Sequence, residues 1–192
     1  MRRRAITALL ACAGLLLLVA ASVRCSGALR ELDQRGFDAL SGGPSDGGAV
    51  RLLAGIADPL PFVVLVTALV CAAVVRGRPR AALAIAAIAT LAALSTEALK
   101  RTLDQGTLHG GAFPSGHTTA AFALTAGLVI AAPERWRRTA LLAGAALATA
   151  IGLSTVRLGW HTPTDVVGGF LVAATVTAAV VIAAQPLSGS AR

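Results

Sequence analysis

The stretch that decides the fold is "PSGHTTAAFALTAGLVIAA", residues Pro114 to Ala132. From Ala120 onward it contains no charged residue, as expected of a helix that crosses a lipid bilayer. Its beginning is polar, since it contains Ser115 and His117. Serine is a favoured residue at a helix N-cap, so Ser115 marks where the helix begins. The stretch therefore predicts a membrane span whose entrance carries a polar site.

The rest of the chain has the composition of a membrane protein. Of its 192 residues 56% are hydrophobic and 14% are charged, with a mean hydropathy of +0.76, which is too apolar for a soluble domain. The formal net charge is +8, but the arginines lie in short clusters between apolar runs, and this excludes a nucleic-acid-binding face. Cys12, Cys25 and Cys71 have no metal-ligand spacing and predict neither a metal site nor a disulfide framework.

Six apolar stretches are each long enough to cross about 30 Å of hydrocarbon, which takes roughly 17 to 25 residues. They run from Ala5 to Val23, Ala57 to Val75, Ala81 to Leu99, Gly116 to Ala132, Thr139 to Val156 and Pro163 to Ala184. We therefore expect an all-α integral membrane protein, a six-transmembrane-helix bundle in which residues 1–192 form a single domain. Asp58, Pro59 and Pro61 predict that the second span has an irregular outer end or a short interfacial helix before it.

The first span has an alternative interpretation as a signal peptide. Arg2, Arg3 and Arg4 precede its apolar core, and small residues follow it. The apolar run is longer than the roughly 7 to 15 residues of a usual signal core, which favours a membrane span.

Basic residues indicate how the bundle is oriented. They cluster in short segments at one side of the expected spans: Arg2, Arg3, Arg4, Arg76, Arg78, Arg80, Arg135, Arg137 and Arg138. This side, with both termini, is expected to be cytoplasmic, and Trp136 and Trp160 fall at span ends as interfacial residues do. The extracytoplasmic side then receives an outer loop at 24–50 and two loops at about 100–117 and 154–165.

The outer loop contains two different patterns. The segment "ALRELDQRGFDAL", residues 28–40, is typical of a short helix lying on the membrane. The glycines and proline that follow predict a loop: Gly42, Gly43, Pro44, Gly47 and Gly48.

Polar and titratable residues converge on the same outer side. His109, His117, His161 and Lys100, the only lysine, all lie on or beside the two shorter outer loops. In "PSGH" the N-cap serine and Gly116 leave helical N–H groups open to an anion beside a histidine. Such an arrangement predicts an anion-binding site with a proton-donating histidine beside it.

In "HTPTD" the carboxylate of Asp165 stands four residues after His161, close enough to bond the imidazole. This contact would fix the tautomer and leave the other ring nitrogen free as a base or nucleophile. The structural alternative for Asp165 is a carboxylate favoured in the first turn by the helix dipole. For Glu97 and Lys100, the alternative is an interfacial ion pair.

These motifs together resemble the type 2 phosphatidic acid phosphatase (PAP2) superfamily of integral membrane lipid phosphatases. The first motif begins at Lys100, the second is Pro114 to His117, and the third is "STVRLGWHTPTD", Ser154 to Asp165. The resemblance implies phosphoryl transfer in two steps without metal or cofactor, in which His161, oriented by Asp165, forms a phosphohistidine. His117 would protonate the leaving group. The phosphoryl oxygens would be held by Lys100, Ser115 and the Gly116 backbone N–H.

The chain departs from the family pattern where arginines are usual, so its first motif is degenerate. The substituted positions are Gln105, Thr107 and Leu108 in the first motif and Thr155 in the third. A guanidinium clamps phosphate oxygens in a way that lysine does not reproduce. Arg157, Arg101 and His109 are the candidates to supply the missing charge.

The expected function is that of a membrane phosphatase. It would hydrolyse a phosphomonoester or pyrophosphate of an outer-leaflet lipid, such as a polyprenyl pyrophosphate, phosphatidic acid or phosphatidylglycerophosphate. One alternative is a catalytically impaired PAP2-like protein that binds or moves anionic lipid, and another is transfer of the head group to a second lipid. Retention of His117, His161 and Asp165 favours an enzyme, because a binder needs positive charge more than it needs an oriented nucleophile.

Overall fold

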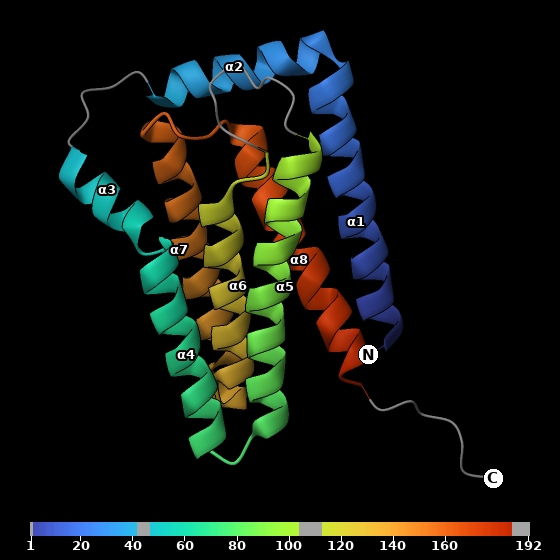
Figure 1. Cartoon of the computed structure of the whole chain (residues 1–192), viewed down its shortest axis with the longest axis vertical. Helices are drawn as coiled ribbons and strands as arrows, with labels where there is room; N and C mark the ends of the chain where they lie inside the picture. The colour runs from blue at the N-terminus through green and yellow to red at the C-terminus, as the bar shows by residue number, and fades with distance from the viewer. Residues whose placement is uncertain (1, 42–46, 104–112, 186–192) are drawn as a thin grey trace.

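The computed structural model describes residues 2–41, 47–103 and 113–185, and within these ranges the chain is helical without strands. Its helices are α1 (Arg2–Cys25), α2 (Gly27–Ser41), α3 (Gly47–Gly55), α4 (Pro59–Val75), α5 (Pro79–Leu103), α6 (Gly116–Ala131), the 3-10 helix η1 (Glu134–Trp136), α7 (Arg137–Arg157) and α8 (Pro163–Ala183). The long helices α1 and α4 to α8 alternate in direction, so that α1 begins and α8 ends at the same end of the bundle (Figure 1). The predicted all-α bundle of six long helices is confirmed.

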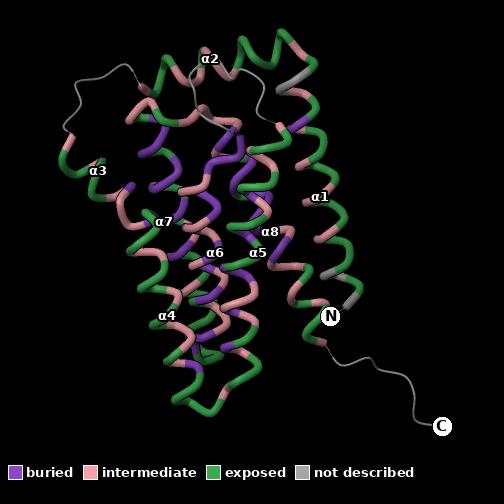
Figure 2. The backbone as a smooth tube through the Cα atoms, in the orientation of Figure 1, coloured by how far each residue is buried: buried purple, intermediate pink, exposed green. Residues whose placement is uncertain are grey.

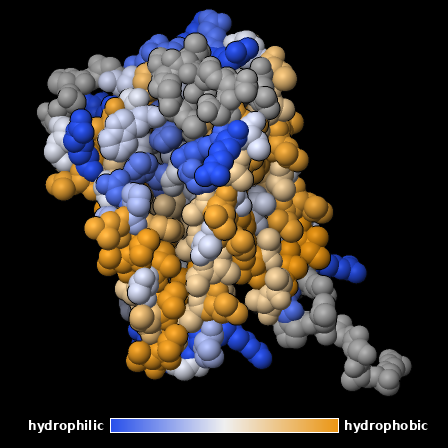
Figure 3. All heavy atoms as spheres, in the orientation of Figure 1, coloured by the Kyte–Doolittle hydropathy of each residue, from blue (hydrophilic) through white to orange (hydrophobic). Residues whose placement is uncertain are grey.

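The bundle has the surface of a multi-pass membrane protein. Within the described ranges, three stretches are each long and apolar enough to cross a membrane without a partner helix: α5, Glu134–Arg157 and α8. The count rises to five if the bent pairs α1–α2 and α3–α4 are each taken as one span. Helix α6 is shorter, since its 16 residues extend only about 24 Å. On the face that Figure 3 shows, hydrophobic side chains cover most of the body of the molecule, whereas hydrophilic ones gather toward its two ends.

The expected outer loop is largely helical. Helix α2 lies at 95° to α1 across one end of the bundle, as predicted for a surface helix (Figure 1). Helix α3 meets α4 at a 46° bend, which confirms the short helix expected before the second span. The prediction that Gly47 and Gly48 belong to a loop is wrong, because they begin α3. Packing of α3 against α7, with Ala54 fully buried, overrides the weak helix propensity of glycine.

Helix α6 lies at the centre of the packing and contacts α4, α5, α7 and α8. Buried positions concentrate where these helices face one another (Figure 2). Glycines of the neighbouring helices allow the close approach: a Cβ at Gly152 of α7 would lie 3.1 Å from Thr118 Oγ1, and one at Gly169 of α8 would lie 2.5 Å from the Ser115 carbonyl oxygen. Small residues at helix contacts are the usual means by which membrane helices pack.

The opposite end of α6 is closed by arginines from the α4–α5 turn. Arg78 donates to the carbonyl oxygens of Ile130 and Ala131 at 2.9 and 3.0 Å, and Arg76 donates to Ala131 at 3.4 Å. These carbonyls have no partner inside the helix, and a positive charge at a helix C-terminus is favourable. The basic turn thus fixes α6 at the end away from α2.

The close approach of α6 and α8 is testable by adding one methyl group. Gly169→Ala should destabilise the protein by about 1–3 kcal/mol, the usual cost of overpacking, because the new Cβ meets backbone atoms that cannot move aside. Thermal unfolding in detergent measures the effect. Gly14→Ala is the matched control, since a Cβ there has no atom within 4 Å. Equal midpoints for both variants and the wild type would show that the contact does not constrain the bundle.

Candidate active site

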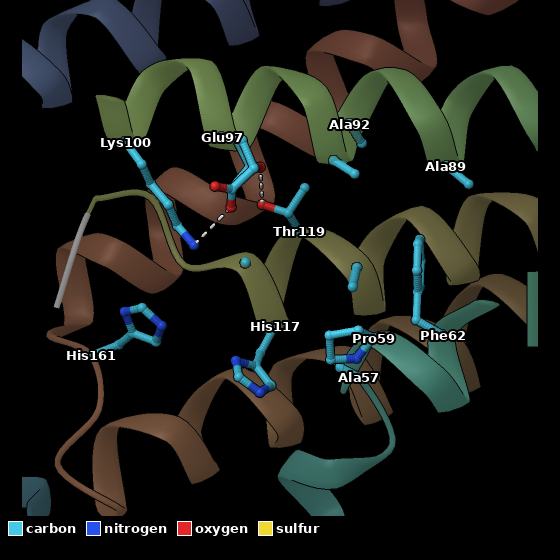
Figure 4. A pocket seen from close by; sticks show the side chains of 14 residues that line it. Ala57, Pro59, Phe62, Ala89, Ala92, Glu97, Lys100, His117, Thr119 and His161 are labelled. Atoms are coloured by element: carbon cyan, nitrogen blue, oxygen red, sulfur yellow. Dashed lines mark hydrogen bonds and ion pairs between the residues drawn. The ribbon is translucent and has the colours of Figure 1, made fainter. Parts of the chain in front are cut away.

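A cavity of about 330 Å³ lies where α4, α5 and α6 meet and reaches Lys100 in the last turn of α5 (Figure 4). Its polar lining residues are Thr96, Glu97, Lys100, His117, Thr119 and His161. Its apolar lining residues include Phe62, Ala89, Ala92, Ala93 and Ala120. The titratable side chains gather at one side of the cavity, and the alanines of α5 and Phe62 continue it on the other (Figure 4).

The N-terminus of α6 is locked to α8 through Ser115. This residue is fully buried, and its backbone N–H donates to the Asp165 carbonyl at 2.9 Å. Its hydroxyl oxygen accepts from the Thr118 N–H at 3.3 Å and from the Thr118 hydroxyl at 3.1 Å, as an N-cap does. Ser115 is not among the described residues that line the cavity. Its observed role is structural, and a direct contact with phosphate stays a prediction.

At Gly116 the N-terminus of α6 lies close to the ammonium group of Lys100. A Cβ built at Gly116 would lie 3.3 Å from Lys100 Nζ, so the absence of a side chain leaves room for the ammonium group beside the helix entrance. Lys100 also donates to Glu97 Oε1 at 3.2 Å, so the ion pair that was the alternative interpretation of these two residues is present. The Lys100 ammonium group therefore lies between the Glu97 carboxylate and the N-terminus of α6.

The two motif histidines face the same cavity. His161 Nδ1 lies 3.2 Å from Asp165 Oδ2, and the same carboxylate oxygen accepts the Thr162 N–H at 3.0 Å. Asp165 is buried, with 3% exposure, so this carboxylate is held in a fixed orientation. The contact occupies Nδ1 and leaves Nε2 of His161 available for reaction. The rings of His117 and His161 are 6.3 Å apart between centroids, close enough to act on one small group between them.

A carboxylate of α2 that was not predicted from the sequence supports residues 161–165, here called the His161 segment. Asp33 of α2 accepts the Thr164 N–H at 2.9 Å and the Thr164 hydroxyl at 2.6 Å. On the same face of α2, Gly36 lies against Pro163 and Phe37 lies near Gly159. The i, i+3, i+4 spacing of Asp33, Gly36 and Phe37 was a usable signal for this contact face.

A second unexpected carboxylate contacts the other histidine. Asp58, the residue before α4, has Oδ1 at 3.0 Å from His117 Nε2. The sequence indicated Asp58 only as a break at the end of a span. The ring of Trp160 lies 5.4 Å from that of His117 between centroids, so the indole also borders the site on the side of His117.

The arginines expected to replace the family's missing charge lie elsewhere. Arg157 is exposed and donates to the Leu40 carbonyl of α2 at 3.4 Å, and Arg101 is exposed on the last turn of α5. Neither is among the described residues that line the cavity. A phosphate-binding role for either stays a prediction, and His109 lies outside the described residues, as do Gln105, Thr107 and Leu108. In the described part of the chain no three His, Cys, Asp or Glu side chains are grouped to hold a metal ion.

Fold and site together define a helical membrane protein whose cavity combines two carboxylate-bound histidines with a lysine. The model of the PAP2 superfamily matches residues 60–188, and the chain therefore belongs to that superfamily. Its fold is similar to the crystal structure of a transmembrane PAP2-type phosphatidylglycerolphosphate phosphatase from Bacillus subtilis. The TM-score is 0.77 at 20% identity, over 90% of this chain and 93% of the other. A search of curated protein sequences found no match.

The support that α2 gives to the His161 segment can be tested by removing the carboxylate. Asp33→Ala leaves the Thr164 N–H and hydroxyl without this acceptor, so α2 should separate more readily from α8. We expect faster tryptic cleavage after Arg30 and Arg35, together with a lower thermal midpoint. Asp38→Ala is the control, because exposed Asp38 accepts from Gln34 within α2. Identical cleavage rates in both variants would contradict the anchoring role.

Proposed function

We propose that this protein is a lipid-phosphate phosphatase that cleaves a phosphomonoester or pyrophosphate of an outer-leaflet lipid through a phosphohistidine on His161. The observation that carries the proposal is the pairing of His161 Nδ1 with the buried Asp165, at a cavity that also holds His117 and Lys100. Membership of the PAP2 superfamily supports phosphatase chemistry at the level of the superfamily.

The first step would transfer the phosphoryl group to the enzyme. The lone pair of His161 Nε2 attacks phosphorus, the bond from phosphorus to the lipid oxygen breaks, and His117 gives its proton to that oxygen. Asp165 keeps the attacking ring in one tautomer and stabilises the positive charge that the ring acquires. Lys100 and the free N–H groups at the start of α6 stabilise the negative charge on the phosphoryl oxygens.

The second step would release phosphate. Water attacks the phosphohistidine, His117 accepts a proton from that water, and the bond between phosphorus and Nε2 breaks. The cycle returns His161 to its neutral form and His117 to its protonated form, so the enzyme is regenerated without a redox partner. If another lipid hydroxyl replaced water, the same residues would transfer the head group instead.

The shape and lining of the cavity support a lipid substrate. Beyond its polar side the cavity is bordered by Phe62 and the small residues Ala89, Ala92 and Ala93, which offer apolar contact to a hydrocarbon chain. The basic clusters support a cytoplasmic location for both termini and thus an extracytoplasmic site. Phosphatidylglycerophosphate, the kind of substrate named for the similar Bacillus subtilis protein, is a candidate beside phosphatidic acid and polyprenyl pyrophosphates.

The second candidate function is binding or movement of anionic lipid without turnover. It is favoured by the buried Thr155, which stands where the family usually has an arginine and donates to the Gly152 carbonyl. It is also favoured by the position of Glu97, which offsets the charge of Lys100 in the cavity. The oriented pair of His161 and Asp165 favours the enzyme, because lipid binding alone does not require a nucleophile.

Phosphate release decides between these functions. Purified protein in detergent should liberate inorganic phosphate from a panel of lipid phosphates in the presence of EDTA, because no step needs a metal ion. His161→Ala should reduce release to background, since the nucleophile is lost, whereas Asp38→Ala, on the exposed face of α2, should retain activity. Binding of the lipids by the wild type with no phosphate release from any of them would favour the second function.

A further inference from the structure

We propose, building on the phosphatase function above, that Asp58 is a positioning residue that holds His117 Nε2 and thereby presents Nδ1 to the leaving group. The contact joins residues that are 59 positions apart, on different helices, with Asp58 Oδ1 at 3.0 Å from His117 Nε2. Each histidine of the site thus has one carboxylate on one ring nitrogen. For His161 the carboxylate occupies Nδ1, and for His117 it occupies Nε2.

The local sequence around Asp58 explains why its side chain is available. Asp58 is the N-cap of α4, a position where a carboxylate normally accepts the N–H of the second or third helical residue. Here Pro61 occupies the third position and has no N–H to donate, so Leu60 at the second position is the one remaining capping donor. The Asp58 side chain makes no capping hydrogen bond and instead reaches His117.

The backbone that carries Asp58 is held firmly against α6. The N–H groups of Ile56, Ala57 and Asp58 donate to carbonyls one turn earlier, at 3.0 to 3.3 Å. Ala57, with 5% exposure, packs in one buried cluster with Ala121 of α6. The bend between α3 and α4 therefore fixes the carboxylate relative to the helix that carries His117.

The geometry assigns a distinct role to each nitrogen of His117. In the protonated ring, Nε2–H donates to Asp58 while Nδ1–H donates its proton to the departing lipid oxygen. After that transfer the neutral ring keeps its proton on Nε2, and Nδ1 is the nitrogen that accepts a proton from water in the second step. Because the Asp58 side chain is 51% exposed, we expect its contribution to be orientation of the ring more than stability of the fold.

A comparison of leaving groups tests this role. Short-chain phosphatidic acid releases an alkoxide that needs a proton, whereas p-nitrophenyl phosphate releases a stable anion that does not. Asp58→Ala should lower kcat on phosphatidic acid by roughly 10- to 100-fold, part of the 10²–10⁴ typical of general acid catalysis. It should leave KM and the release of p-nitrophenolate in the first turnover near wild-type values, because that step needs no proton from His117. Asp58→Asn, which keeps the shape and an acceptor oxygen, should lie between, and Asp38→Ala is the matched control.

Three outcomes would overturn the inference. Equal losses of product release in the first turnover of both substrates would mean that Asp58 acts on phosphate binding or on the fold, and unchanged first-turnover release on both would mean that the contact has no catalytic consequence. Independently of activity, ¹⁵N NMR of the ring nitrogens, with the His117 signal assigned through His117→Ala, should show a proton on Nε2 that Asp58→Ala perturbs. A His117 signal that does not respond to Asp58→Ala also overturns it. A wild type that releases phosphate from no lipid of the panel but shows this response would reject the phosphatase function and retain the Asp58–His117 pair.

Discussion

The site depends on one hydrogen bond, from the Ser115 N–H to the Asp165 carbonyl, which joins the beginnings of α6 and α8. His117 stands two residues after the donor, and His161 stands four residues before the acceptor. This junction therefore fixes the start of α6, which carries His117, relative to the start of α8, which His161 precedes. Gly169 makes the junction possible, because any Cβ at that position would collide with the Ser115 carbonyl.

Around this junction, three carboxylates hold the two histidines and the segment between His161 and Asp165. Asp165 orients His161 from within the same segment, Asp33 reaches Thr164 from α2, and Asp58 reaches His117 from the corner between α3 and α4. Each of these contacts gives a polar group a defined partner at the border of an apolar bundle, where an unpaired one would be costly. Helices α2 and α3, which do not cross the bundle, thus belong to the construction of the site.

The long helices were predictable from sequence because bilayer thickness sets the length of an apolar run, and the six expected stretches match α1 and α4 to α8 within a few residues. The contact of His161 with Asp165 was also predictable, since residues four apart in a helical turn are neighbours. The contacts of Asp33 and Asp58 were not, because they depend on the 95° and 46° angles between helices and join residues far apart in sequence. The N-cap role of Ser115 was predictable, but its burial away from the cavity depends on how closely α8 approaches.

The central claim is that the junction of α6 and α8 presents His161 Nε2 as a nucleophile. It is tested most directly by looking for the covalent intermediate. Protein mixed with a lipid substrate labelled on its phosphate should be denatured at alkaline pH, which preserves phosphohistidine, and analysed by mass spectrometry of its peptides. The account predicts label on His161 that is absent from His161→Ala. Label on His117, or phosphate release at full rate with no labelled peptide at any time, would contradict it.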